Sequence, residues 1–154
     1  FLESTSVPVD FIFFDLPGTV NTPGILKALA GMHHIFTPII ADRVVMESTL
    51  IFTQLMKDVI MKKGETSIET INLFWNQVDG RERSPLYDVY NKLIDELGLS
   101  LMQCQIMNST RFRKESEADA KTVFRSTLMP PDERLMNACR LDQFMMEFLR
   151  IVQL

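Results

Sequence analysis

The first candidate for chemistry is an acidic residue that directly follows an apolar run. Asp15 comes after Phe11–Phe14 and is followed by Leu16, Pro17 and Gly18. Such a run predicts a buried strand that ends at Asp15, and open α/β sheets bind ligands at the carboxyl ends of their strands. In nucleotide-hydrolysing proteins a carboxylate there holds Mg²⁺, and a Pro17-Gly18 turn would let the backbone approach a γ-phosphate. The alternative is an ordinary strand-end aspartate that caps a loop, and the residues alone favour neither.

A second polar pair lies at the end of another apolar run. Asn76 closes the run Ile71–Asn76, and Asp79 follows three residues later, before Gly80. A side-chain amide offers both a donor and an acceptor, so Asn76 is a candidate for binding the edge of a purine base. An Asn and an Asp-Gly pair also form ordinary turns, which are the commoner explanation of such a pair taken alone.

The other reactive residue types form weaker patterns. His33 and His34 are adjacent, so on a strand their side chains would point to opposite faces, and we expect no metal there. Cys104 and Cys139 are too few for a disulfide framework or a four-thiolate metal site. We expect both to be reduced thiols in a core.

Four apolar runs bounded by turn residues must position these side chains. We expect strands over 11–15, 34–40, 71–76 and 99–106, each followed by a helical stretch. This alternation predicts an α/β fold with a mostly parallel sheet flanked by helices.

Capping residues and glycines mark the expected helix ends. They are Asn21, Thr22 and Pro23 for the first helix, Asp42 and Gly64 for the second, Ser84, Pro85 and Gly98 for the third, and Asp132 for the last. One apolar stripe from Leu135 to Val152 predicts that the last helix is continuous. Its segment from Arg140 carries no net charge, so we expect it to dock on the sheet rather than on a membrane.

Length and composition bound the class of protein. The chain has 154 residues, of which 46% are hydrophobic and 23% charged, which predicts a single domain over 1–154 and excludes disorder. The net charge of −4 gives no global basic field to attract nucleic acid or anionic lipid. No apolar run approaches the ~20 residues that span a bilayer, and we expect a cytoplasmic protein.

Taken in order, several segments resemble the ParA/MinD group of deviant-Walker ATPases. The run Val9–Gly18 is similar to the family's Walker B segment, His34–Asp42 to its next strand and Pro-rich turn, and Asn76–Asp79 to an Asn-Arg-Val-Asp-like strand end. Residues 106–113 and 120–124 are similar to the stretch after the family's penultimate strand. More narrowly, the chain resembles the ParA-like ATPases of Bacteroides conjugative transposons.

The resemblance implies a P-loop NTPase-like fold and an intact protein that uses ATP and Mg²⁺ for DNA partition or transfer. It implies that Asp15 orders Mg²⁺ and the attacking water, that Pro17 and Gly18 lie near the phosphates, and that Asn76 binds adenine. The implied partners are a second copy of the chain in a homodimer, DNA and a regulatory protein, with no membrane.

The family's phosphate-binding loop is missing from the chain. The only candidate, Lys62–Thr66, lacks the first glycine and the Gly-Lys-Thr order, and it follows an expected helix. Leu16 stands where the family has threonine, and Met107 where proline is frequent. Because the chain also starts at Phe1 rather than at methionine, we expect a carboxyl-terminal fragment that is inactive and without cofactor on its own.

Other interpretations remain open. The main alternative is a non-catalytic α/β module for protein contacts. A flavodoxin- or receiver-like domain fits less well, because a receiver needs an acidic pair at its first strand and a lysine at its last. Without the family's central phosphate-loop strand, we expect the sheet to close the gap or the chain to form a homodimer. The apolar second helix also favours association.

Overall fold

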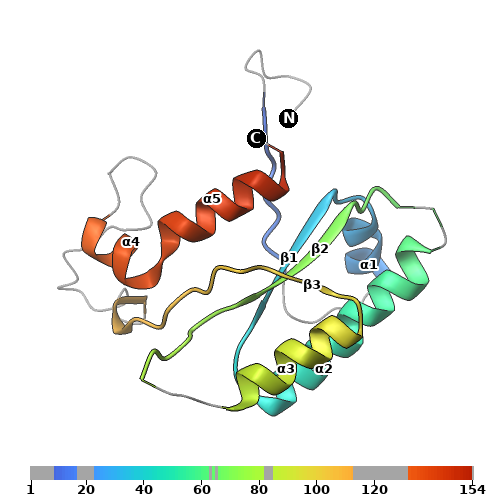
Figure 1. Ribbon diagram of the computed structural model, residues 1–154. Helices are drawn as coiled ribbons and strands as arrows, with labels where there is room; N and C mark the ends of the chain where they lie inside the picture. The colour runs from blue at the N-terminus through green and yellow to red at the C-terminus, as the bar shows by residue number, and fades with distance from the viewer. Residues whose placement is uncertain are drawn as a thin grey trace.

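A parallel sheet of three strands in the order β1-β2-β3 forms the centre of the computed structural model (Figure 1). β1 (His34–Ile39) pairs with β2 (Thr70–Trp75) along its whole length, and β2 pairs with the short β3 (Ser100–Leu101). The structure describes residues 9–16, 23–62, 64, 66–81, 85–112 and 132–153. Parallel strands joined by helices confirm the predicted α/β class.

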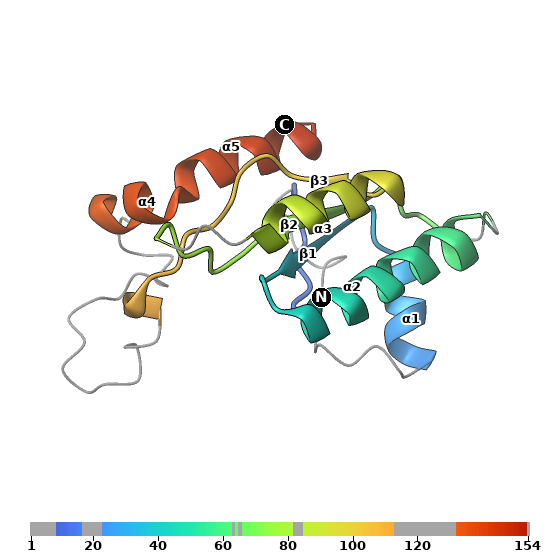
Figure 2. The same ribbon diagram turned by 60° about the horizontal axis from the view of Figure 1, so that its bottom comes forward.

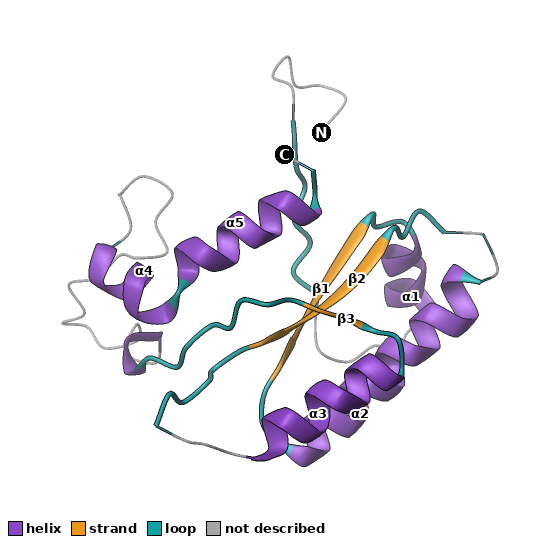
Figure 3. Ribbon diagram, in the orientation of Figure 1, coloured by secondary structure: helices purple, strands orange, loops and turns teal. Residues whose placement is uncertain are grey.

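Helices cover both faces of this sheet (Figure 2). They are α1 (Pro23–Ala30), α2 (Arg43–Leu55) with its π-helical continuation η2 (Met56–Met61), α3 (Pro85–Glu96), the short 3₁₀ helix η3 (Thr110–Phe112), α4 (Glu133–Cys139) and α5 (Leu141–Ile151). Figure 3 shows α2 and α3 together on one side of the strands and α5 on the other. Among the described residues, none of these helices is long and apolar enough to cross a bilayer.

Side chains alternate between the two faces of the sheet along each strand, and each face packs against different helices. Ile39 of β1 and Leu73 of β2 lie in one buried cluster with Met46 and Leu50 of α2 and Ile94 of α3. The even-numbered residues lie on the other face and contact α5. The rings of Phe36 and Phe148 are 4.7 Å apart, and those of Phe74 and Phe144 are 4.8 Å apart. The segment from 141 therefore docks on the sheet, as its lack of net charge predicted.

Most of the described helix signals are confirmed. Asp42 accepts the Val45 N–H at 3.0 Å as the cap of α2, and Asp132 accepts the Leu135 N–H at 2.9 Å as the cap of α4. Pro23 and Pro85 are the first residues of α1 and α3. Gly64 and Gly98 have φ angles of 70° and 61°, which suit glycine after a helix. Asn21, Thr22 and Ser84 lie outside the described residues.

The prediction of one continuous last helix is wrong. The chain forms two helices, because Arg140 adopts a left-handed conformation with φ 59° between α4 and α5. The turn changes the direction of the chain. Leu135 and Cys139 are the buried residues of α4, and Phe148 is the buried residue of α5. The apolar spacing continues across the turn, which is why the stripe alone gave no sign of it.

The predicted buried strand over Phe11–Asp15 is also wrong. These residues have no regular secondary structure, and the side chains of Ile12, Phe13 and Phe14 are exposed. A strand needs a neighbour to satisfy its backbone groups. No strand of the described residues pairs with this segment, and it is held by its rings instead, with Phe13 stacked 5.7 Å from Phe148.

The fourth predicted strand is present in part. Only Ser100 and Leu101 are regular strand, yet the chain stays beside β2. Met102 donates its N–H to Leu73, and Ile106 donates to Trp75, at 2.8 Å each. Between these two hydrogen bonds the chain advances four residues, from Met102 to Ile106, while β2 advances two, from Leu73 to Trp75. A regular parallel ladder would advance two residues on both strands. The extra residues form a bulge, which interrupts the expected strand.

Candidate functional site

Asn76 lies at the carboxyl edge of the sheet, directly after β2. Its backbone N–H continues the ladder to Ile39 at 2.7 Å, and its side-chain carbonyl accepts the Gln77 N–H at 2.9 Å. Gln77 turns the chain with a φ of 55°. Within the described residues, no group accepts a hydrogen bond from the side-chain nitrogen of Asn76. The amide is thus fixed on its acceptor side and has donors to offer a ligand.

Asp79 takes part in an ordinary turn, the alternative to ligand binding that the sequence allowed for the Asn76 and Asp79 pair. Its carboxylate accepts the Arg81 N–H at 2.9 Å, two residues along the chain. This hydrogen bond closes the loop after β2. One oxygen of Asp79 has a local structural role, and Asn76 is the better placed of the pair for binding a ligand.

The segment after the bulge braces this loop. Val78 donates its N–H to Ile106 at 3.0 Å and accepts the Asn108 N–H at 2.8 Å. Met107, which lies between Ile106 and Asn108, packs against the loop at Gly80. A Cβ atom added to Gly80 would be only 3.1 Å from the terminal methyl group of Met107. Met107, expected from the sequence at a position where ParA/MinD ATPases often have proline, packs on this loop.

Asp15 is exposed at the end of the irregular segment. The next residue, Leu16, packs against the buried cluster of Leu29 and Ile35, so the backbone is anchored just beyond the carboxylate. No hydrogen bond or ion pair joins Asp15 to Asn76. Pro17 and Gly18, the other predicted phosphate-side residues, lie outside the described residues. The Asp15 carboxylate is open to solvent, and among the described residues it belongs to no cluster of three or more His, Cys, Asp or Glu side chains.

The side chains that usually bind metal ions are scattered over the described residues. Those residues contain no cluster of three or more His, Cys, Asp or Glu side chains. Of the adjacent histidines, His34 places Nδ1 at 2.9 Å from the Thr70 hydroxyl and Nε2 at 3.8 Å from the Glu69 carboxylate. The ring is held by the sheet, which explains its position without a metal.

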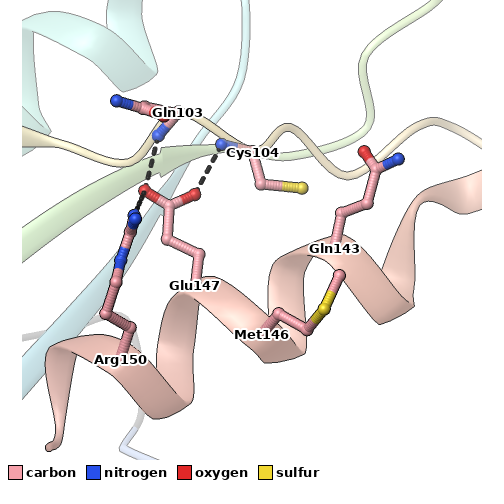
Figure 4. A pocket seen from close by; sticks show the side chains of 6 residues that line it. All are labelled: Gln103, Cys104, Gln143, Met146, Glu147 and Arg150. Atoms are coloured by element: carbon pink, nitrogen blue, oxygen red, sulfur yellow. Dashed lines mark hydrogen bonds and ion pairs between the residues drawn. The ribbon is translucent and has the colours of Figure 1, made fainter.

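Glu147 on α5 is a residue that sequence reasoning counted only as a charge. Its two oxygens accept the backbone N–H groups of Gln103 at 2.8 Å and Cys104 at 2.7 Å, inside the bulge after β3 (Figure 4). The side chain is 11% exposed, and the guanidinium of Arg150 lies 3.8 Å from it. The buried carboxylate is therefore paired on both oxygens.

An open groove with a volume of about 440 Å³ lies beside this carboxylate. It is lined by Gln103, Cys104, Gln143, Met146, Glu147 and Arg150 (Figure 4). Burial raises the pKa of the Cys104 thiol, and the nearby negative charge of Glu147 raises it further. A thiol with a raised pKa is a poor nucleophile at neutral pH. The groove holds polar groups whose hydrogen bonds serve the fold and no activated nucleophile.

Comparison with known proteins adds no identification. No protein-family model matches the chain, and no curated protein is similar to it in sequence. Function therefore has to be inferred from the geometry. The carboxyl edge offers the partly fixed amide of Asn76 and a braced loop, which suit binding more than bond cleavage. Asp15 is not part of this edge, because its neighbour Leu16 packs near the start of β1, against Ile35.

Proposed function

We propose that the chain is the carboxyl-terminal part of a ParA-like ATPase of a conjugative or other mobile element, acting in the cytoplasm. The observation that carries this proposal is the parallel order β1-β2-β3, with Asn76 at the carboxyl end of the central strand. Open parallel sheets bind nucleotides at that edge. The strands also agree in position with the segments that resemble the ATPase family, because β1 begins at His34 and β2 ends at Trp75, directly before Asn76–Asp79.

In the intact protein Asn76 binds the adenine edge and Asp15 orders Mg²⁺ and the attacking water. The free donors of the Asn76 amide and the exposure of the Asp15 carboxylate support these roles. Pro17 and Gly18 would lie near the phosphates. The cycle of MgATP binding and hydrolysis would change the affinity of a homodimer for DNA and for a regulatory protein.

The coding sequence upstream of Phe1 is the first test, and a Gly-rich phosphate loop with lysine is the expected result. In the longer protein Asp15→Asn should abolish hydrolysis, and Asn76→Ala should raise the KM for ATP. Asp88→Asn, which changes an exposed acid on α3, is the matched control and should leave both unchanged. Hydrolysis that survives Asp15→Asn would leave Asp15 as a loop cap and refute the assigned role.

A non-catalytic module for protein contacts is the second candidate, and exposed apolar side chains favour it. On α2 the side chains of Val44, Ile51 and Leu55 lie on one face and are open to solvent. Exposed apolar stripes of this kind mark contact surfaces. The upstream coding sequence separates the two candidates, because a module needs no phosphate loop.

A further inference from the structure

The strand β3 forms one edge of the sheet and has backbone groups that face away from it. Met102 donates its N–H to Leu73 on β2, and Ser100 and Leu101 lie opposite Asn72 and Leu73. Because backbone groups alternate in direction along a strand, Leu101 directs its N–H and C=O outward. Among the residues that the structure describes, no backbone hydrogen bond reaches these two groups. Figure 1 looks onto this edge, which lies open between α5 and α3.

The bulge after β3 interrupts this edge without closing it. Gln103 and Cys104 donate their N–H groups to Glu147 on α5, and Ile106 returns to the ladder with β2. Gln105 therefore faces outward again. Its N–H is without a hydrogen-bond partner in the described part of the chain, and its carbonyl accepts only the weak thiol donor of Cys104, at 3.8 Å. Bulges commonly protect an edge from pairing, but this one leaves the positions on either side of it open.

The bulge also sets the spacing between the two outward-facing positions. Met102 and Ile106 donate to residues of β2 that are only two positions apart. Leu101 and Gln105, which directly precede these donors, therefore lie about 6–7 Å apart along the sheet, as alternate residues of a regular strand do. One added strand can thus pair with both through two of its own alternate residues. Met107 ends the open stretch, because its N–H is donated to a carbonyl of α4.

The groove of about 440 Å³ between α5 and the bulge runs beside these positions. The α5 residues that line it, Gln143, Met146, Glu147 and Arg150, repeat at spacings of three and four and so lie along one side of the helix. From Gln143 to Arg150 the helix rises ~10 Å, the length of about three residues of extended chain. Figure 4 shows Arg150 near Gln103 at one end of the groove and Gln143 at the other. The groove therefore suits a short extended segment that lies along α5.

The side chains of the groove indicate which kind of segment it accepts. Met146 is 65% exposed and offers an apolar contact. The amides of Gln103 and Gln143 can donate and accept hydrogen bonds, as the peptide groups of a strand do. Glu147 already accepts two N–H groups, whereas Arg150 is 71% exposed and forms no contact closer than 3.8 Å to Glu147 among the described residues. The guanidinium of Arg150 thus has donors to offer a second carboxylate.

We propose that this edge and groove bind an extended peptide segment of another protein, which adds to β3 as an antiparallel strand and places an acidic side chain at Arg150. In antiparallel pairing, one peptide residue exchanges two hydrogen bonds with Leu101, and the residue two positions before it does so with Gln105. All the outward groups of these two residues are then used. Since Arg150 lies at the Gln103 end of the groove, the acidic residue lies toward the carboxyl end of the peptide. Main-chain hydrogen bonds supply the affinity of such a contact, and the groove supplies its selectivity.

This binding surface goes beyond the ATPase assignment and does not depend on it. A phosphate loop upstream of Phe1 has no bearing on whether a peptide pairs with β3, so the two proposals can fail separately.

Fluorescence anisotropy with a labelled peptide tests the proposal. The probe is a short peptide of alternating valine and threonine that ends in glutamate. We expect saturable binding that Arg150→Gln weakens about tenfold, because the carboxylate of the peptide loses its charged partner. Arg134→Gln on α4 removes an exposed arginine outside the groove and is the matched control, which should bind as the wild type does. A peptide that ends in glutamine should bind wild type and Arg150→Gln equally.

Methylation of the peptide backbone tests the pairing with β3 itself. Alternate N–H groups of a strand face the same side, so methylating one alternate set should abolish binding and methylating the other set should leave it unchanged. Amide hydrogen exchange of the protein should slow at Leu101 and Gln105 when the unmodified peptide binds.

Equal binding of the two methylated peptides would overturn the proposal, as would the absence of saturable binding at millimolar peptide. Weaker binding in Arg134→Gln but not in Arg150→Gln would also overturn it. The same holds if the Leu101 and Gln105 amides are protected before any peptide is added. Protection that does not depend on protein concentration would mean that the chain covers its own edge, and protection that rises with concentration would mean that a second copy does.

Discussion

The Glu147 carboxylate accepts the backbone N–H of Cys104 at 2.7 Å, across 43 positions of sequence. The same carboxylate accepts the N–H of Gln103, so α5 supplies the acceptors that β2 does not supply inside the bulge. Buried backbone donors need a partner. Without Glu147 the N–H of the buried Cys104 would lose its partner, whereas the exposed Gln103 would turn its N–H to water. The bulge and the helix therefore depend on each other, and the first prediction tests this dependence.

Replacing Glu147 by Ala should lower the free energy of unfolding by about 2–4 kcal/mol, because the hydrogen bond from the buried Cys104 N–H to this charged acceptor contributes about 1.5–3 kcal/mol and the one from the exposed Gln103 contributes less. Urea denaturation monitored by circular dichroism measures the change. Asp142→Ala removes an exposed acid from the same helix and should change the midpoint little. Equal effects of the two variants would mean that the carboxylate does not hold the bulge.

The ion pair between Arg111 and Asp132 predicts a dependence of stability on pH. The Arg111 guanidinium lies 3.0–3.1 Å from both Asp132 oxygens and lowers the pKa of that carboxyl to about 2. A lowered pKa in the folded state stabilises the fold above the unfolded value near 4, and this contribution is lost as the pH falls from about 4 to 2. Asp132→Asn should therefore destabilise the chain at pH 7 and make little difference at pH 2.

Asparagine is a suitable variant here because it caps a helix nearly as well as aspartate. The difference in urea midpoint between wild type and Asp132→Asn, followed from pH 7 downward, is the measurement. A difference that persists undiminished at pH 2 would show that the ion pair is not its source.

The left-handed turn at Arg140 predicts a stabilising substitution. A side chain in this conformation costs about 1 kcal/mol or more relative to glycine. Arg140→Gly should therefore raise the melting temperature, because the turn between α4 and α5 has a φ of 59° at this residue. Asn137→Gly, at an exposed position inside α4, should lower it by removing helix propensity. Destabilisation by both glycines would contradict the turn.

The isolated chain should neither hydrolyse ATP nor bind MgATP more tightly than about millimolar, a free energy of only ~4 kcal/mol. It has no Gly-rich loop with lysine to hold the β- and γ-phosphates, where catalysis of phosphoryl transfer resides. Isothermal titration measures the affinity. Submicromolar binding would contradict the prediction and would mean that other residues of the chain form a phosphate site.

The parts of the fold that were predictable depend on local signals. The runs of β1 and β2 are apolar and bounded by turns, and Asp42, Asp132, Gly64 and Gly98 act within one helical turn of the backbone they cap. Asn76 was placed correctly at a strand end because it follows β2 directly. These features need no knowledge of distant residues.

The parts that were not predictable depend on distant partners or on unusual conformations. The bulge requires Glu147, which is 43 residues from Cys104. The run Phe11–Phe14 has the composition of a strand, but composition does not supply a neighbour for its backbone. The turn at Arg140 uses a residue without special preference for φ near 59°. At the candidate site, the sequence likewise does not indicate which distant residues lie around Asp15.

The contacts of α5 also bear on the order in which the chain folds. Phe144 and Phe148 are one turn apart and meet β2 and β1, while Glu147 binds the segment after β3. A single helix thus contacts β1, β2 and the segment after β3, and it is synthesised after them. Its contacts with β1 span more than a hundred residues, and long-range contacts slow folding. On the ribosome, the face of the sheet that carries Phe36 and Phe74 would therefore stay uncovered until residues 144–148 have emerged.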